Sequence, residues 1–526
     1  MIVFAILPRC SKFSKHAKIQ SDNVFEIDCR MHYICGQQQS NMSSKSIVLK
    51  FVFAITVLSG ALFSSCLSAQ SREVNITIYL RGVYESKISL LALSSNRTYK
   101  PIMELPGIRD GHEGKLLVDK AFLPGEFVLR FDYKETEAST PYPSEKNIFI
   151  SDQDLELRVN PKYSNNGDST WFQKDERENS AFVRFSTENS RQKEKLGLLQ
   201  NFLMNYDEPE SAFYKQGVKE YEQRRHAYNQ WLAKTTRQDK ALFVSNLYPF
   251  QYVPQISYSG TETDRVKSVI DHYFDGMDFQ DPLLLKTAVL NKWMDNYVNL
   301  YGQLATTIAL RDSLFPAAGQ NAIEKARKGH PLVYGWMVDY FYRGYETNGI
   351  NAGMKILEPY LSDTNCLTTK RQEIGRRLKG MQTLVPGSLA PEIKLLENDG
   401  MPFELSTLKA TGKFILVLFW SAGCSHCVEL ADQLYPWQQL PEIRDQIMVA
   451  GISLDESETD IDAWEQKIKT MKGWTHLHSG EGVNGKTASD YYILATPVMV
   501  LIDANTKKIM ALPNTLDELK KAVLSY

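Results

Sequence analysis

The sequence predicts a multidomain protein with a β-sandwich-like N-terminal domain, an all-α middle domain and a C-terminal α/β domain. Three observations predict this class. Apolar and polar residues alternate in residues 70–163, aromatic residues recur at helical spacing in residues 164–385, and apolar strands alternate with helices in residues 386–526. The length of 526 residues agrees with this division, because a domain has about 150 residues.

The composition is that of an ordinary globular protein, with 43% hydrophobic residues, 23% charged residues and a net charge of −2. These values exclude a collagen-like, a coiled-coil and a wholly disordered chain. Because there is no excess of basic residues, we expect no nucleic-acid partner and no binding to an anionic membrane surface.

Residues 1–69 are interpreted as a misassigned leader followed by a signal peptide, with Met42 as the true start. Two lysines and then the apolar stretch 51–62 follow Met42, and small residues ending at Ala69 form a cleavage site. The apolar stretch is shorter than the roughly 20 residues that span a bilayer, which favours a signal peptide over a transmembrane helix.

Cys66 also fits a bacterial lipoprotein motif, although Phe63 is not the preferred residue at its first position. Cleavage after Ala69 and lipidation of Cys66 both stay open. Either event predicts export to the periplasm of a Gram-negative bacterium, with membrane attachment only if Cys66 is lipidated.

Export changes the interpretation of the cysteines. Four of the seven lie in residues 1–69, which leaves Cys366, Cys424 and Cys427. A secreted protein stabilised by disulfides would carry more cysteines, in even number. We therefore interpret the close pair as catalytic and Cys366, in a polar loop, as an incidental thiol.

Residues 70–163 are predicted to form a small antiparallel sandwich. Apolar residues alternate with polar ones in residues 74–80, and the strand pattern continues in residues 127–133. Pro106-Gly107 and Pro124-Gly125 are predicted turns. The region contains no catalytic constellation, so we interpret it as a docking or spacer module.

Residues 164–385 are predicted to be helical, because aromatic and apolar residues share one helix face in residues 210–232. Similar patterns run through residues 263–275, 282–301 and 331–346. We interpret the aromatic stripes as core, with a groove for a partner as the alternative. His272 and His330 are predicted to be surface or capping groups.

The C-terminal domain is predicted to begin within the segment TLVPGSLAPEI (residues 383–393), which contains two prolines and a glycine. The run FILVLFW at residues 414–420 predicts a central strand that is buried on both faces. Further strands are predicted at residues 446–454, 474–478, 497–503 and 507–512. Helices are predicted at residues 424–437, 458–471 and 515–526. This order predicts an α/β sheet with helices on both sides.

Cys424 and Cys427 follow the central strand in the sequence FWSAGCSHC. At a helix start, Cys424 would face the positive end of the helix dipole, which favours its thiolate. Cys427, about one turn later, could then attack a mixed disulfide at Cys424. Two other uses stay open, namely inert buried thiols and half of a zinc site.

A zinc site would need two further ligands besides the cysteine pair. The candidates are His426, His476, His478 and Cys366, and no second paired motif accompanies them. We expect His476 and His478, which alternate on a predicted strand, to be surface residues.

Residues 386–526 resemble a thioredoxin-fold domain of the periplasmic thiol–disulfide oxidoreductases of the TlpA/ResA type. The resemblance rests on the entry segment GSLAPEI, the motif FWSAGCSHC and the later segment YYILATPVMVLID. It implies an exported enzyme that exchanges electrons with protein disulfides or dithiols and with a membrane or periplasmic electron donor or acceptor. No metal or organic cofactor is implied.

The same resemblance implies that Cys424 attacks the substrate and that Cys427 resolves the mixed disulfide, so that Cys424–Cys427 is a redox-active disulfide. Thr496 and a cis Pro497 would shape the substrate cleft. Further active-site support is assigned to Trp420, Ser425 and His426; a protonated His426 would stabilise the thiolate and make the disulfide more oxidising.

The sequence departs from the family at two positions. Leu418 stands where thioredoxins bury an acid, and Gly423 stands where a tryptophan commonly precedes the first cysteine. Deprotonation of Cys427 therefore lacks an evident helper, since Glu429 is expected to be solvated. The rival interpretation is a periplasmic binding or scaffold protein with a redox-inactive thioredoxin-like domain.

Overall fold

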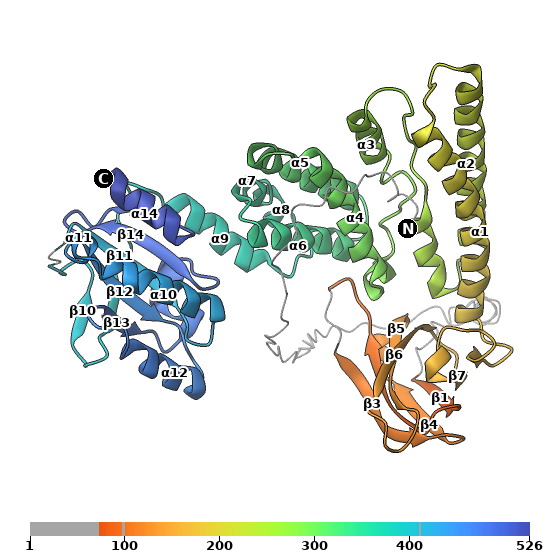
Figure 1. The fold of residues 1–526 in the computed structure, drawn as a ribbon, viewed down its shortest axis with the longest axis horizontal. Coiled ribbons are helices and arrows are strands. Elements are labelled where there is room, and N and C mark those ends of the chain that lie inside the picture. The colour runs from red at the N-terminus through yellow and green to blue at the C-terminus, as the bar shows by residue number, and fades with distance from the viewer. Residues whose placement is uncertain (1–72, 97–99, 410–411) are drawn as a thin grey trace, which may run out of the picture. The chain divides into compact units, whose positions relative to one another are not determined.

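The computed structural model describes residues 73–96, 100–409 and 412–526 (Figure 1). The expectations for Met42, the signal peptide, Cys66 and Ala69 lie outside these residues. No helix in the described ranges is long and apolar enough to cross a membrane. The predicted boundaries after residues 69, 163 and 385 stay predictions.

The chain divides into two compact units, whose division runs through helix α4 (Val289–Leu304). The first unit comprises the residues up to Met277 together with Leu283–Met294. The second comprises Asp278–Pro282 and Asp295–Tyr526. Each unit is described by itself.

Two four-stranded sheets begin the first unit, with strand orders β4-β1-β7-β8 and β3-β2-β5-β6. Their apolar residues share one buried cluster, so the two sheets form a sandwich-like pair, as predicted. The strands are β1 (Val74–Leu80), β2 (Glu85–Ala92), β3 (Pro101–Arg109), β4 (Glu113–Val118), β5 (Gly125–Lys134), β6 (Tyr142–Ile150), β7 (Leu155–Val159) and β8 (Trp171–Phe172). The short 3-10 helices η1 (Lys120–Phe122) and η2 (Pro161–Tyr163) connect them.

Two details of this sandwich were predicted wrongly. Strand β1 pairs with β7 in parallel, because the chain passes through the other sheet before β7 returns beside β1. Pro106-Gly107 is not a turn but lies inside the edge strand β3. The pairing register shifts there, as in a β-bulge, and an edge strand tolerates a residue without a backbone N–H.

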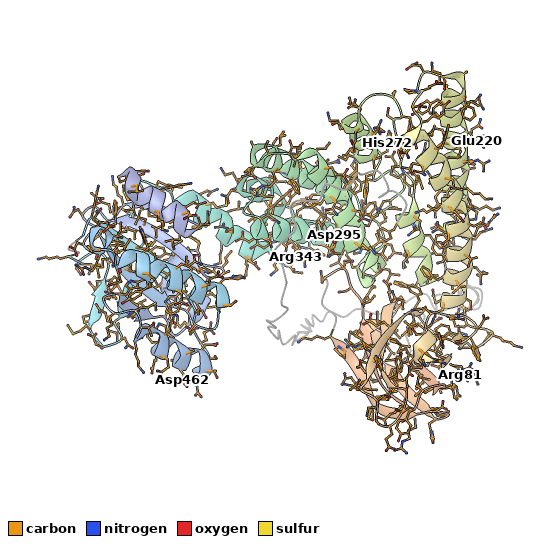
Figure 2. The ribbon with its side chains drawn as sticks, viewed as in Figure 1. Arg81, Glu220, His272, Asp295, Arg343 and Asp462 are labelled. Atoms are coloured by element: carbon orange, nitrogen blue, oxygen red, sulfur yellow. The ribbon has the colours of Figure 1, made fainter. Side chains whose placement is uncertain are left out.

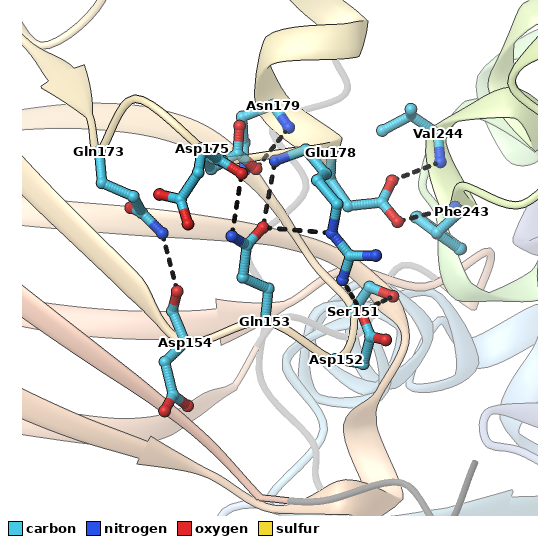
Figure 3. A network of polar contacts seen from close by, with 12 residues as sticks. Ser151, Asp152, Gln153, Asp154, Gln173, Asp175, Glu178, Asn179, Phe243 and Val244 are labelled. Atoms are coloured by element: carbon cyan, nitrogen blue, oxygen red, sulfur yellow. Dashed lines mark hydrogen bonds and ion pairs between the residues drawn. The ribbon is translucent and has the colours of Figure 1, made fainter.

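Helices α1 (Glu178–Asn205), α2 (Ala212–Gln238) and α3 (Glu262–Asp271) follow, with η3 (Phe243–Gln251) between the last two. A polar network joins the start of α1 to its neighbours (Figure 3). The Glu178 carboxylate accepts hydrogen bonds from the N–H groups of Phe243 (2.9 Å) and Val244 (3.1 Å). Asn179 exchanges two hydrogen bonds with the backbone of Phe149 in β6. These contacts tie α1 to both η3 and the sheet.

Further helices complete the helical region, which agrees with the all-α prediction. They are η4 (Pro282–Lys286), α4, α5 (Ile308–Ala326), α6 (Pro331–Thr347), α7 (Asn351–Ile356), α8 (Glu358–Leu361) and α9 (Arg371–Thr383). Tyr297, Tyr334 and Tyr345 are among the largest fully buried side chains, so much of the aromatic stripe is core.

The second unit ends in a five-stranded sheet with the order β13-β12-β11-β14-β15. The central strand β11 is fully buried, as predicted, and pairs in parallel with β12 and antiparallel with β14. The strands are β11 (Phe414–Trp420), β12 (Ile447–Ser453), β13 (Thr475–His478), β14 (Val498–Asp503) and β15 (Ile509–Ala511). A hairpin of β9 (Lys394–Leu396) and β10 (Pro402–Glu404) precedes them.

The two faces of this sheet are covered differently (Figure 1). Helices α10 (Ser425–Gln438), α12 (Glu458–Ile468) and α14 (Leu516–Ser525) share one apolar cluster with the sheet. The other face packs against α13 (Lys486–Asp490) and the β9–β10 hairpin. Short turns α11 (Pro441–Arg444) and η5 (Gly482–Asn484) complete the α/β domain. The predicted fold class is confirmed.

Candidate dithiol active site

Cys424 and Cys427 lie at the start of α10, directly after the central strand. Cys424 is the N-cap residue, with φ −98° and ψ 110°. Its Sγ accepts a hydrogen bond from the backbone N–H of Cys427 at 3.3 Å. The sulfur therefore faces the unpaired amides of the first helical turn, which stabilise negative charge. The predicted position at a helix start is confirmed.

The two sulfurs differ in exposure, although both cysteines are free. Cys424 is partly exposed, whereas Cys427 is fully buried. Burial raises the pKa of the Cys427 thiol, and the hydrogen bond to Cys424 raises this pKa further. The first cysteine is therefore accessible to a substrate, while the second is covered and held as a thiol.

The segment Thr496–Pro497 lies beside this pair. The peptide bond between the two residues is cis, as the family resemblance implied. The carbonyl oxygen of Thr496 accepts a hydrogen bond from the Cys424 Sγ at 3.8 Å. Both residues are partly exposed, as Cys424 is.

Asp455, which the sequence analysis missed, holds the loop between the central strand and Cys424. Its carboxylate accepts hydrogen bonds from the Ser421 hydroxyl and from the N–H groups of Ala422 (3.0 Å) and Gly423 (3.4 Å). Asp455 is only 2% exposed. The sequence does contain a signal for Asp455, which follows the predicted buried strand 446–454. When two strands are parallel, the residues that follow them lie at the same edge of the sheet, so this acid can reach the loop after residues 414–420.

Two further residues hold Asp455 in place. The Ser453 hydroxyl donates to its carboxylate at 2.7 Å. The His478 Nε2 lies 2.8 Å from the Asp455 carbonyl oxygen, and its ring stacks on Trp464 of α12. The loop before Cys424 is thus connected by hydrogen bonds to strands β12 and β13.

The comparisons with known proteins cover the part of the chain that contains this pair. Residues 412–508 match a family described as thioredoxin-like. The C-terminal domain is thioredoxin-like. No curated protein matches the chain.

Several solved structures are similar to the thioredoxin-like domain. A thiol–disulfide oxidoreductase from Bacteroides fragilis NCTC 9343 is 24% identical over 26% of this chain and 98% of its own, with a TM-score of 0.24. The thioredoxin domain of a thiol–disulfide oxidoreductase from Bacteroides vulgatus is 27% identical over 27% of this chain and 97% of its own, with a TM-score of 0.24.

One similar structure reaches beyond the thioredoxin-like domain. A thioredoxin-like protein from Bacteroides caccae is 17% identical over 52% of this chain and 98% of its own, with a TM-score of 0.36.

The three supporting residues of the predicted site lie in different surroundings. Trp420 is fully buried in the same apolar cluster as Cys427. Ser425 and His426 are exposed in the first turn of α10. Within the described residues, no hydrogen bond or ion pair joins His426 to either cysteine. Its influence on the thiolate therefore stays a prediction.

The structure shows the surroundings of Leu418 and Gly423, the two positions at which the sequence departs from the family pattern. Leu418 is fully buried in β11, so an apolar side chain occupies the position of the thioredoxin acid. Glu429 is exposed on α10, as expected. A Cβ on Gly423 would lie 2.6 Å from the Asp460 carboxylate, so a larger side chain at this position would require the Asp460 side chain to move.

The remaining candidate zinc ligands, His476, His478 and Cys366, are buried or half-buried. His476 and His478 are half-buried rather than on the surface, because α12 and the loop after it pack against their strand; the prediction for both was wrong. His476 contacts the Met471 carbonyl oxygen at 2.9 Å, and burial lowers its pKa. Cys366 is buried, which raises its pKa to about 11.

The other two histidines act as predicted. His272 is the C-cap residue of α3 (Figure 2), and the His330 side chain accepts a hydrogen bond from the Leu332 N–H at the start of α6. Across the described part of the chain, no group of three or more His, Cys, Asp or Glu side chains could hold a metal ion.

Proposed function

We propose that this chain is an exported thiol–disulfide oxidoreductase that exchanges electrons with protein disulfides through Cys424 and Cys427. One observation carries the proposal: the partly exposed Cys424 sulfur accepts a hydrogen bond at a helix start from the backbone N–H of a buried Cys427. The match to the thioredoxin-like family supports it, because a helix-start dithiol is a redox pair in that fold.

The reaction proceeds in two exchange steps. The Cys424 thiolate attacks one sulfur of a substrate disulfide, forms a mixed disulfide and releases the other substrate sulfur as a thiolate, which takes up a proton. Cys427 then loses its proton and attacks the Cys424 sulfur. The Cys424–Cys427 disulfide forms, the second substrate thiol leaves, and two electrons have passed to the substrate.

The environment of Cys427 determines which step is slow. Its raised pKa keeps Cys427 protonated while the mixed disulfide forms, so the second step has to wait until this thiol loses its proton. Because Leu418 replaces an acid, the proton of Cys427 has to leave through the substrate or water. We infer that release of the reduced substrate limits turnover.

The cycle needs a further redox partner but no bound cofactor, because the electrons pass through the dithiol itself. A membrane or periplasmic electron donor or acceptor would return the pair to its starting state. We place this exchange in the periplasm, with lipidation of Cys66 as the route to a membrane if the leader is not removed at Ala69.

The reduction potential of the pair is the decisive measurement, taken on residues 70–526 in a thiol buffer. A value near the roughly −270 mV of thioredoxin would indicate a reductase, and one near the roughly −120 mV of a strong periplasmic oxidant would indicate disulfide formation or isomerisation. The Cys366→Ser variant, which removes the third thiol, is the matched control. If no reversible two-electron exchange occurs, the proposal fails and the scaffold interpretation replaces it.

A further inference from the structure

Helix α9, which precedes the thioredoxin-like domain, contacts two different parts of the second unit. One side faces α6, where the Arg377 Nε donates to the Glu346 carboxylate at 3.0 Å and the Tyr342 hydroxyl donates to Glu373 at 2.8 Å. The other side faces the segment that leads to Thr496–Pro497. Neighbouring arginines of one helix thus hold different partners.

Arg376 binds two backbone carbonyl groups of the thioredoxin-like domain. Its Nη2 donates to the carbonyl oxygen of Val483 at 3.4 Å and to that of Ile493 at 3.3 Å. A guanidinium group stays charged and presents several donors in a fixed plane, so it can hold two carbonyl groups at once. Arg376 therefore bridges both ends of the stretch that contains α13.

Gly380, four residues after Arg376, lies on the same face of α9. A Cβ at this position would be 2.8 Å from the Cβ of Tyr492, so the two backbones approach each other closely. Tyr492 has a φ of 51°, which is rare for a residue other than glycine. The Lys379 Nζ lies 6.0 Å from the centre of the Tyr492 ring. Helix α9 thus packs against Tyr492, whose backbone conformation needs support from neighbouring residues.

The supported segment ends at the active site. Ile493 is three residues before Thr496, whose carbonyl oxygen contacts the Cys424 sulfur at 3.8 Å. The same stretch has other attachments: the Ile493 N–H donates to the Ala488 carbonyl oxygen, and the Tyr491 hydroxyl donates to that of Pro391. Arg376 adds a charged contact from helix α9 at the Ile493 carbonyl group, on the side of this residue that leads to Thr496.

We propose that Arg376 is a positioning residue for the Thr496–Pro497 segment, so that helix α9 takes part in binding an extended polypeptide substrate. The proposal rests on the proposed exchange function. The substrate of that function, a protein disulfide, is part of a polypeptide chain that can pair with the backbone at Thr496 when it is extended. A small disulfide needs access to Cys424 alone.

The test compares Arg376→Met with Arg377→Met in the full chain. Both variants remove one arginine from the same helix, but only the first breaks the contact with Ile493. We expect Arg376→Met to reduce insulin about tenfold more slowly, through a higher KM, because a misplaced binding group slows the reaction. Its rate with dithiobis(nitrobenzoate), a small disulfide, stays unchanged, and Arg377→Met leaves both rates unchanged.

Hydrogen exchange gives a second readout that does not depend on catalysis. In Arg376→Met the amides of residues 493–498 exchange faster than in the parent chain, and in Arg377→Met they do not. The proposal is overturned if the two variants match each other in insulin reduction and in exchange. It is also overturned if Arg376→Met slows both substrates equally, since general loosening would do that.

A failure of the proposed function is recognised separately. If the parent chain reduces neither insulin nor the small disulfide, the exchange function fails. The hydrogen-exchange comparison of the two variants then still shows whether Arg376 holds the segment before Thr496.

Discussion

Buried carboxylates serve different purposes in the two units of this molecule. In the first unit, Glu126 and Glu178 join strands to helices. In the second, Asp455 holds a loop of three residues in front of a reactive cysteine. All three are at most 5% exposed. The comparison shows that one device, a buried acid surrounded by donors, supports either stability or reactivity according to what lies beside it.

The first-unit acids connect segments that are far apart in the sequence. Glu126 in β5 accepts hydrogen bonds from the Thr287 hydroxyl and the Ala288 N–H before α4, and from Asn147 in the neighbouring strand. Burial raises the pKa of Glu126 despite these donors. Glu178 connects α1 to η3 in the same way. Loss of either set of hydrogen bonds would weaken the attachment between these elements but would not change the surroundings of Cys424.

Asp455 differs because its donors, apart from the Ser453 hydroxyl of β12, belong to one short loop. They come from successive residues that end directly before Cys424. Displacement of this carboxylate would move the Cys424 sulfur relative to the first turn of α10. We therefore expect Asp455 to control reaction rate more than unfolding free energy.

The largest expected effect tests whether Cys424, the cysteine next to the loop that Asp455 holds, is the reactive residue. Cys424→Ser should lower the rate of insulin reduction by roughly a thousandfold or more, because a hydroxyl does not replace a thiolate as nucleophile. Urea unfolding of the variant should match the parent. Cys366→Ser, the matched control, should keep the full rate. Comparable activity in Cys424→Ser would remove the proposed chemistry from this site.

Asp455→Asn should slow insulin reduction about tenfold, which corresponds to about 1.4 kcal/mol in activation free energy. An amide group brings its own N–H toward donors of the loop and leaves them partly unpaired. Asp503→Asn is the matched control, since Asp503 accepts from the N–H groups of Asn505 and Thr506 in a turn of the same domain. Equal rates for both variants would show that Asp455 is only structural.

The stability of the first unit is expected to depend on pH because of Glu126. Its pKa is raised in the folded state, so the folded protein binds more protons in the range between its unfolded and folded pKa values. Stability should therefore rise as the pH falls from neutral through the folded pKa of Glu126, and this contribution is complete below the unfolded pKa. Slower hydrogen exchange in β5 at the lower pH, after correction for the intrinsic rate, would show it.

Glu126→Gln removes this titration, so the difference in exchange between the two pH values should disappear. Glu104→Gln is the control, because Glu104 on β3 is exposed and its contact with Lys87 lowers its pKa. That group is already ionised across this range. If Glu126→Gln keeps the full pH dependence, another group is responsible.

The smallest expected effect concerns His426. Because its side chain is exposed, its interaction with the Cys424 thiolate should be worth only about 0.5 kcal/mol. His426→Ala should therefore lower the reduction potential of the pair by roughly 10 mV, since the reduced form loses a little stabilisation. The measurement is the same thiol-buffer titration. A fall of several tens of millivolts would mean that His426 approaches the sulfur more closely in solution.

Local patterns determined much of this protein. The apolar run 414–420 predicted a strand buried on both faces, and the cysteines that follow it were predicted at a helix start. Both features depend on a few consecutive residues, so their physical cause is contained in the sequence. The Thr496–Pro497 segment was identified through the family resemblance, which also implied its cis peptide bond.

Only the tertiary structure decided which distant residues meet the reactive pair. Asp455 reaches the loop before Cys424 because β12 lies parallel to β11, and Arg376 reaches Ile493 because α9 packs against the domain that follows it. The parallel pairing of β1 with β7 has the same origin. Periodicity reports which face of an element is buried, but the partner across that face depends on how the elements pack.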